Sequence, residues 1–327
     1  MIHTRFLRAT ALAVTLAAGG LPAGAETLKF AHWVPPAHTL TASTIEPLVA
    51  AVEGSGIEIE VYPGGELGAG PLEQYVRVVQ GVADIVWGLQ GYTSSQFPKS
   101  MVAELPGAVP EGMAGYDLIW NAYDAGLLNG EFPATKPLAL WMAEPNIFIM
   151  RDVDVRTPDD LKGLKIRVSG AAAAATIEAL GATPVQMPAG EMYNSLQTGL
   201  IDGIVTDPSA VGDFKLDEVA NSYTLNAPLG HISFYVVMNA AKYEGLADEQ
   251  KAGFDAIVGR PLSKSAADGW TAKTAKAIEN LAATGDNTVY SLSADERAAF
   301  EALTHPVTDA IVAQGGNEEV LATMQGR

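Results

Sequence analysis

The sequence predicts an α/β protein of two lobes, each a mainly parallel sheet with helices on both faces. Short apolar runs of strand length alternate with longer amphipathic runs of helix length, and this series occurs twice, the second time from about residue 150. The length of 327 residues, of which 48% are hydrophobic, suits two domains with packed cores.

The first series starts with a strand at residues 28–31. A helix follows over residues 39–52, because apolar side chains recur there at helical spacing, and residues 57–61 alternate with the period of two typical of a strand. A helix over residues 72–80 and a strand at 85–87 complete this series. Such a strand–helix–strand rhythm favours parallel pairing between strands.

The second series begins at Thr157, where Thr-Pro-Asp-Asp predicts a capped helix start. The elements expected after it are a strand at 164–168, a helix at 171–180, a short strand around Val185, a helix at 189–198, and strands at 203–206, 222–225 and 234–239.

Two long helices are expected near the C-terminus. Residues 261–283 read as one helix interrupted only by Gly269, about 35 Å long at roughly 1.5 Å per residue, which could run along both lobes and tie them together. Residues 294–313 are also predicted to be helical. We assign residues 26–145 and 233–265 to lobe 1, and residues 146–232 and 266–327 to lobe 2.

Residues 1–25 have the pattern of a secretory signal peptide. Arg5 and Arg8 precede an apolar run at residues 9–18, and Ala-Gly-Ala ends the segment at Ala25. An N-terminal membrane anchor is the alternative, but the run is much shorter than the roughly 20 residues that span a bilayer. We expect cleavage near Ala25, export to the periplasm and no membrane insertion of the mature chain.

Composition excludes several kinds of function. The net charge of −18, which becomes −20 when the two arginines of the signal peptide are removed, argues against binding to nucleic acid, because phosphate-backbone binders carry basic patches. The chain has no cysteine, so disulfides, thiol catalysis and cysteine-ligated metals are absent.

The sequence contains no recognisable catalytic motif. It has no His-Glu-x-x-His, no Gly-x-Ser-x-Gly and no phosphate-binding loop, and its glycine cluster at residues 64–70 does not fit Gly-x-Gly-x-x-Gly. No metal, no cofactor and no enzymatic activity are therefore expected.

Several spaced motifs occur together along the chain. They are Asp-Leu-Lys-Gly-Leu-Lys-Ile-Arg at 160–167, Gly-Ala-Thr-Pro at 181–184, Glu-Met-Tyr-Asn-Ser-Leu-Gln-Thr-Gly-Leu-Ile-Asp-Gly at 191–203, Leu-Lys-Phe-Ala-His at 28–32, Val-Tyr-Pro-Gly-Gly-Glu-Leu-Gly at 61–68 and Val-Gln-Gly-Val-Ala-Asp-Ile at 79–85. In this order they resemble the substrate-binding proteins of TRAP transporters, the tripartite ATP-independent periplasmic systems, over essentially the whole mature chain.

The resemblance implies a fold like that of periplasmic binding proteins, with a ligand cleft between two lobes. It also implies a function in transport: the protein would bind a small organic acid by lobe closure and deliver it to the membrane subunits of the permease. In that family the arginine that ends the Gly-Leu-Lys-Ile-Arg strand binds the ligand carboxylate, and here it is Arg167. A guanidinium suits this role because it offers two parallel donors and a permanent charge. A surface arginine paired with a nearby aspartate is the alternative.

Other candidate ligand contacts lie at strand ends in lobe 1. His32 and Trp33 follow the first strand at its carboxyl end, where open parallel sheets bind ligands. Trp87 and Tyr92 could form an apolar wall of the cleft. A structural role for His32, and core packing for the two aromatic residues, are the alternatives.

Two departures from the family pattern bear on the ligand. Asn146, five residues after Trp141, stands where many members carry a second arginine, and either Thr206 or Asp207 takes a position that is often asparagine. These residues favour a small monocarboxylate, such as a hydroxy or oxo acid, over a dicarboxylate. The tryptophans Trp33, Trp87 and Trp141 leave open an aromatic acid or a zwitterion.

Two other functions remain open on the sequence alone. An exported lyase or isomerase could use His32 and a carboxylate as acid and base. The same two-lobed fold also serves ABC importers.

Overall fold

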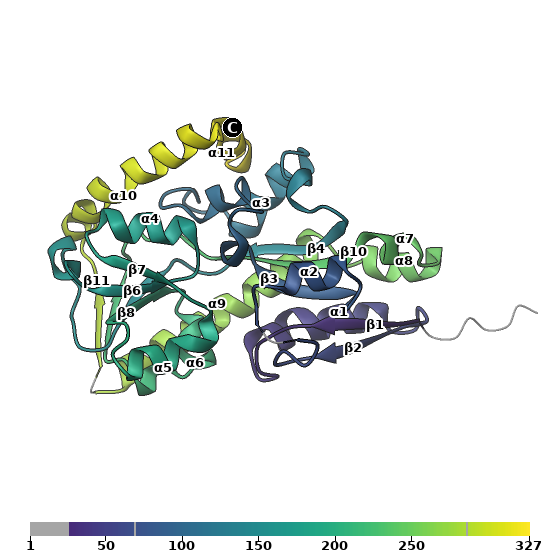
Figure 1. Ribbon diagram of the computed structural model, residues 1–327, viewed down its shortest axis with the longest axis horizontal. Helices are drawn as coiled ribbons and strands as arrows, with labels where there is room; N and C mark the ends of the chain where they lie inside the picture. The colour runs from purple at the N-terminus through teal and green to yellow at the C-terminus, as the bar shows by residue number, and fades with distance from the viewer. Residues whose placement is uncertain (1–25, 69, 286) are drawn as a thin grey trace, which may run out of the picture.

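The structure is a computed structural model that describes residues 26–68, 70–285 and 287–327. The predicted signal peptide at residues 1–25 lies outside the described residues. Two sheets form the centres of two lobes, and helices cover both sheets (Figure 1). The prediction of a two-lobed α/β fold is confirmed.

The sheet of lobe 1 has five strands from two parts of the chain. Their order is β2 (Ile57–Tyr62), β1 (Glu26–Ala31), β3 (Ile85–Leu89), β10 (Ser233–Asn239) and β4 (Thr135–Met142). Strand β1 pairs parallel with β2 and β3, in register Glu26↔Ile57 and Phe30↔Ile85, whereas β10 runs antiparallel to both of its neighbours.

The sheet of lobe 2 has six strands, and it too contains one strand that is antiparallel to both of its neighbours. Their order is β11 (Thr288–Ser291), β9 (Ser222–Leu225), β5 (Ile147–Met150), β8 (Gly203–Thr206), β6 (Lys165–Val168) and β7 (Thr183–Gln186). Strand β5 is antiparallel to β8 and β9, and the other pairs are parallel. In each sheet the antiparallel strand is the one that the chain enters directly from the other lobe.

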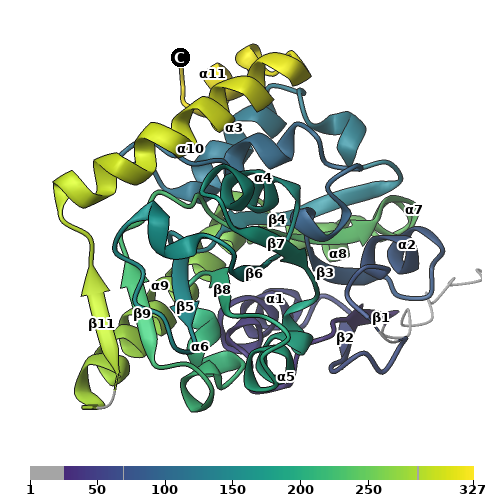
Figure 2. The same cartoon turned by 60° about the vertical axis from the view of Figure 1, so that its left-hand side comes forward.

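The helices pack around these two sheets (Figure 2). The α-helices are α1 (Glu46–Val52), α2 (Gln74–Val79), α3 (Gly115–Asp124), α4 (Ala171–Ala179), α5 (Met192–Gln197), α6 (Ser209–Asp213), α7 (Ala240–Glu244), α8 (Asp248–Asp255), α9 (Arg260–Ala283), α10 (Ala294–Gly315) and α11 (Glu318–Met324). The short helical turns are η1 (Thr41–Ile45), η2 (Gln90–Thr93), η3 (Ser100–Glu104), η4 (Asn129–Glu131), η5 (Pro158–Leu161), η6 (Ala189–Glu191) and η7 (Leu216–Glu218).

Some elements differ from those expected. The helix predicted over residues 39–52 is present, but Thr41–Ile45 form a π-helical turn, η1, within it before it continues as α1. The helix start predicted at Thr157 yields only the single turn η5, although Thr157 and Asp160 form the expected capping box. Helix α3 and strands β4, β5 and β11 have no counterpart in the sequence prediction.

Helix α9 passes from one lobe to the other, as predicted. It contacts β4 and α3 in lobe 1, and α6 and β11 in lobe 2. Gly269 lies where α9 crosses η1, and a β-carbon at this position would overlap Ser43. The glycine that interrupts the helical pattern therefore allows the two helices to approach closely.

The C-terminal helix lies on a different lobe from the one expected. Residues 266–327 were assigned to lobe 2, but α11 contacts α3 and η3 of lobe 1, and Asn121 of α3 donates a hydrogen bond to the carbonyl of Met324 at 3.0 Å. Helix α10 carries the chain back across the molecule (Figure 1). None of the described helices is long and apolar enough to cross a membrane.

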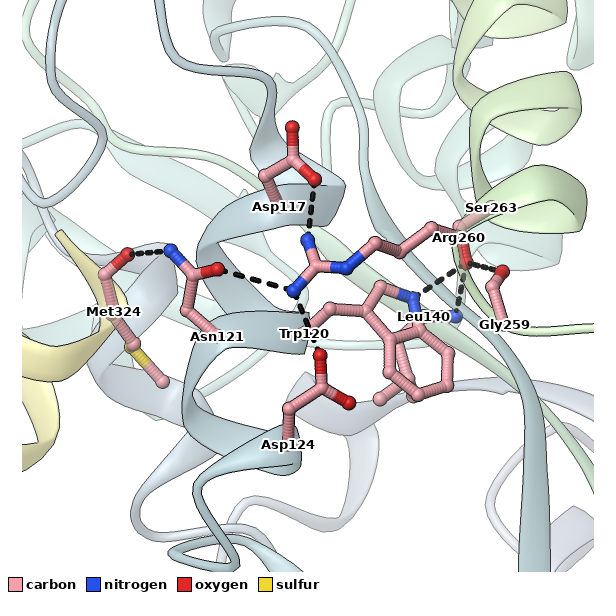
Figure 3. Close-up of polar contacts among 9 residues, drawn as sticks. All are labelled: Asp117, Trp120, Asn121, Asp124, Leu140, Gly259, Arg260, Ser263 and Met324. Atoms are coloured by element: carbon pink, nitrogen blue, oxygen red, sulfur yellow. Dashed lines mark hydrogen bonds and ion pairs between the residues drawn. The ribbon is translucent and has the colours of Figure 1, made fainter. Parts of the chain in front are cut away.

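A polar cluster joins the start of α9 to α3 and β4 (Figure 3). Arg260 forms ion pairs with Asp117 and Asp124 of α3. One turn later, the hydroxyl of Ser263 accepts hydrogen bonds from the indole N–H of Trp120 at 2.8 Å and the backbone N–H of Leu140 at 2.9 Å, and donates to the carbonyl of Gly259 at 2.8 Å. Ser263 is fully buried, so this hydroxyl satisfies two donors that water does not reach.

Ser263→Ala is expected to lower the free energy of unfolding by about 2–4 kcal/mol, because it leaves two buried N–H groups without an acceptor. Urea denaturation followed by circular dichroism would measure the loss. The exposed Ser291 provides a matched control, and Ser291→Ala should change stability by less than about 0.5 kcal/mol. Equal effects of the two substitutions would contradict this role of Ser263.

Candidate functional site

A cavity lies between the two lobes and is lined by both. Its free volume is about 30 Å³, roughly that of one water molecule, so a larger ligand requires the walls to move apart. Lobe 1, the chain crossing and α9 contribute Trp33, His38, Trp87, Leu89, Ile232, Phe234 and Trp270; lobe 2 contributes Arg167, Ala189, Thr206, Asp207, Ser209, Ala210 and Phe214.

Arg167 brings a buried cation to this cavity. It lies on β6, and its side chain is among the largest fully buried ones, with 1% exposure. Its Nε donates to the carbonyl of Met187 at 3.0 Å, and Nη2 reaches the hydroxyl of Tyr92 at 3.5 Å. Burial lowers the pKa of Arg167, while Tyr92 and the more distant Asp207 and Glu191 oppose this shift.

No carboxylate forms an ion pair with Arg167 within the described part of the chain. Its Nη1 also makes no hydrogen bond to these residues. A buried cation without an anionic partner is unfavourable, because the charge has lost its hydration without compensation. The arrangement therefore suits a ligand that supplies the missing anion.

Tyr92 connects the lobes next to this arginine. It lies on η2 of lobe 1, and its hydroxyl accepts a hydrogen bond from the backbone N–H of Ala189 in lobe 2 at 2.8 Å, besides the contact to Arg167. Burial raises the pKa of Tyr92, so the hydroxyl keeps its proton at neutral pH. This contact is made only when the lobes are together.

Aromatic rings form most of the remaining wall. Trp33 stacks on Trp87 with ring centroids 5.2 Å apart, Trp87 stacks on Phe234 at 5.7 Å, and Phe234 packs on Trp270 at 5.2 Å. Phe214 of lobe 2 stacks on Trp33 from the other side at 6.3 Å. The indole N–H groups of Trp33 and Trp87 have no acceptor among the described residues, so two donors remain free in the wall.

Both residues that the sequence left as alternatives line the cavity. Thr206 ends β8 with 3% exposure, and Asp207 follows it with 4%. The carboxylate of Asp207 accepts hydrogen bonds from the hydroxyl of Ser209 and from its backbone N–H, the latter at 3.1 Å. Burial raises the pKa of Asp207 to about 6, and Ser209 opposes part of the shift.

His38 is a cavity residue that sequence reasoning missed. Its Nδ1 accepts a hydrogen bond from the backbone N–H of Leu40 at 3.1 Å, which leaves the proton of the neutral ring on Nε2. Burial lowers the pKa of His38 to about 4, a shift that Asp213 opposes and Lys273 reinforces. The loop Pro-Pro-Ala before His38 carries no motif that would have pointed to it.

Phe214, Phe234, Trp270 and Ser209 were also missed. Phe234 lies in a strand, Trp270 lies in a helix and Phe214 directly follows a helix. The apolar pattern of such elements is the same for a side chain in the core and for one that lines a cavity, and only the packing of the lobes distinguishes these positions.

Four predicted residues do not line the cavity. Tyr92 is not part of its apolar wall and lies beside it, in contact with Arg167. His32 is buried and lines a separate surface groove with Pro36 and Ile45. Trp141 is fully buried in the core of lobe 1, against Phe234 and Trp270. Asn146 lies in the crossing between lobes, where its side chain donates to the carbonyl of Leu229 at 3.4 Å.

The raised pKa of Asp207 predicts a dependence of stability on pH. The folded state binds a proton more tightly than the unfolded chain, so Asp207 makes the wild type less stable as pH rises from about 4 to 7. Asp207→Asn removes this pH-dependent loss of stability. The unfolding free energy of the variant minus that of the wild type should therefore increase by about 2 kcal/mol between pH 4.5 and 7.5. Chemical denaturation of both proteins at each pH measures it, and a difference independent of pH would contradict the shift.

The chain matches a known family over most of its length. The sequence model of bacterial extracellular solute-binding proteins of family 7, DctP, matches residues 30–315. The C4-dicarboxylate-binding periplasmic protein DctP of Rhodobacter capsulatus is 28% identical over 330 residues, which cover 96% of this chain and 94% of that protein.

Solved structures agree in fold as well as in sequence. A TRAP solute-binding protein from Rhodoferax ferrireducens, in complex with copurified benzoate, has a TM-score of 0.85 and 29% identity, covering 92% of this chain and 96% of that chain. A marine metagenome TRAP protein specific for aromatic acids, crystallised with 3-hydroxybenzoate, has a TM-score of 0.84 and 27% identity over 93% of this chain and 98% of that chain. The chain therefore belongs to family 7 of the bacterial extracellular solute-binding proteins, the periplasmic solute receptors of TRAP transporters.

Proposed function

We propose that this receptor binds a small aromatic monocarboxylate and delivers it from the periplasm to the membrane subunits of its permease. The observation that carries the proposal is a single unpaired buried arginine in a cavity whose walls are mainly aromatic rings. Relatives that bind benzoate and 3-hydroxybenzoate support the same ligand class.

Arg167 would bind the carboxylate. Its Nη1 makes no hydrogen bond within the described chain, and no carboxylate there forms a direct ion pair with it. A charge-assisted hydrogen bond to a carboxylate strengthens as lobe closure expels water. The unpaired indole donors of Trp33 and Trp87 offer further hydrogen bonds to ligand oxygens.

The aromatic ring of the ligand would lie among Trp33, Trp87, Phe214 and Phe234. Aromatic pairs prefer offset-stacked or edge-to-face geometry and contribute about 0.5–1.5 kcal/mol each beyond the area they bury. An aliphatic acid such as lactate fills less of this wall and would bind more weakly.

Asp207 makes a second carboxylate on the ligand unfavourable. It lies in the same cavity and is buried, so another anion beside it would be repelled with little screening. A ligand hydroxyl could instead donate to it. The proposed ligand is thus an acid with one carboxylate and, where it carries a further polar group, a hydroxyl.

A zwitterion is the second candidate, because aromatic rings and Asp207 also suit a cationic group. The relatives that bind benzoate and 3-hydroxybenzoate favour the aromatic acid.

Lobe closure is the proposed mechanism. A ligand between the lobes contacts both of them only when they are closed, so it shifts the equilibrium toward the closed form by the difference in affinity. The permease can then recognise that form. In this proposal the protein is a receptor without catalysis, and residues 1–25 direct it to the periplasm and are removed.

Isothermal titration calorimetry with benzoate, 3-hydroxybenzoate, lactate, succinate and ectoine tests the ligand class. We expect the two aromatic acids to bind most tightly. Arg167→Ala should weaken their binding by about 2–5 kcal/mol, the typical loss when one partner of a buried charge pair is removed. The half-exposed Arg151 on the same lobe is a control, and Arg151→Ala should bind like wild type. Succinate or ectoine binding more tightly than both aromatic acids would refute the proposed ligand class.

A further inference from the structure

Asp213 lies at the boundary between the lobes, outside the group of residues that would contact the ligand. It ends α6 in lobe 2, and its side chain is only 2% exposed. The hydroxyl of Thr39 in lobe 1 donates to Oδ2 of Asp213 at 2.8 Å, and Nε2 of His38 lies 3.5 Å from the same oxygen. The other oxygen pairs with the ammonium of Lys273 on α9 at 2.9 Å.

The neighbour of Asp213, Phe214, forms part of the partition between the cavity and solvent. Phe214 and Trp33 line both the cavity and an open groove on the surface, to which Asp213 also belongs. Phe214 of lobe 2 packs between two rings of lobe 1, since it stacks on Trp33 at 6.3 Å and meets the edge of His38 at 5.7 Å. A ligand that leaves by this side must separate these rings.

The contacts of Asp213 fall into two groups. Lys273 lies on α9, which packs on both α6 and η1, so its pair with Asp213 joins the carboxylate to the helix that runs along both lobes. The contacts to Thr39 and His38 join different lobes and exist only when the lobes are together. Interactions made in one of two states shift the equilibrium toward that state.

We propose that Asp213 is a positioning residue that holds the lobes closed over the bound ligand by accepting the hydroxyl of Thr39 and facing His38. Lys273 pairs with the other oxygen and orients the carboxylate, so little side-chain conformational entropy is lost when the lobes meet. The rings of Trp33, Phe214 and His38, which separate the cavity from solvent, are thereby held together. This inference deepens the proposed function, since it rests on a ligand bound between the lobes.

The absence of cysteine makes closure directly measurable. Glu58→Cys on β2 and Gln197→Cys at the end of α5 introduce two exposed labelling sites, one on each lobe, into an otherwise cysteine-free chain. Spin labels attached to these cysteines allow the distance between the lobes to be measured by double electron–electron resonance. The measurement is made without ligand and again with saturating 3-hydroxybenzoate as the probe.

Asp213→Asn keeps the shape of the side chain and removes its charge. We expect its ligand-free distance distribution to shift toward longer distances than in wild type. Stopped-flow measurements with 3-hydroxybenzoate should show dissociation about tenfold faster at a nearly unchanged association rate, because loss of a buried charged partner acts mainly on dissociation. Thr39→Val should act in the same direction with a smaller effect, since the charge of Asp213 remains.

Asp217→Asn is the matched control, because Asp217 is an exposed aspartate four residues away that makes no hydrogen bond or ion pair to lobe 1 among the residues that the structure describes. It should match wild type in distances and rates. The proposal is overturned if Asp213→Asn leaves the distance distribution unchanged, or if it slows association without speeding dissociation. If 3-hydroxybenzoate does not bind wild type, the proposed ligand class fails, while the ligand-free distances still decide the role of Asp213.

Discussion

The guanidinium of Arg167 is a permanent cation that the fold removes from water without a carboxylate at ion-pair distance in the described chain, and the nearby Asp207 and Glu191 offset only part of the cost of burial. Its hydrogen-bond partners in the described chain are one carbonyl and one phenol hydroxyl, and its side chain lines the cavity. Such an arrangement is costly in isolation. It is sustained by rigid strands and apolar cores in both lobes, and it becomes favourable when a carboxylate completes it.

The rest of the cleft follows from this constraint. The arginine comes from lobe 2, whereas the tyrosine beside it and most of the aromatic wall come from lobe 1. Neither lobe alone excludes water from the guanidinium, and exclusion of water is what makes the charge a strong binding group. Lobe closure is therefore the step that makes the interaction between Arg167 and the ligand strong. The contacts of Asp213 with Thr39 and His38 add to that event without touching the ligand.

The sequence predicts the parts of this protein that depend on local pattern. Alternating apolar runs identify most strands of both sheets, and the long helix α9 is found to within one residue, Arg260 instead of Pro261, because its periodicity and length are unmistakable. Arg167 is placed by a spaced motif. His38 and Phe214 are missed, and His32, Trp141 and Asn146 turn out to lie away from the cavity, because the position of a side chain relative to a cleft depends on how two lobes meet. Strand β5 is not predicted at all, and β10 is predicted as a strand but without its antiparallel direction, which is set by the crossing between lobes.

The overall charge places a limit on how this receptor can work. A chain with a net charge of −18 repels an anionic ligand at long range, so electrostatic steering cannot raise its rate of capture. Salt screens that repulsion beyond about 8 Å at physiological ionic strength, whereas a buried guanidinium acts at contact distance and is hardly screened. The attraction must therefore be local and must develop late, as the lobes close. A receptor of this kind gains affinity through slow release more than through fast capture, and the contacts between the lobes then matter as much as the contacts to the ligand.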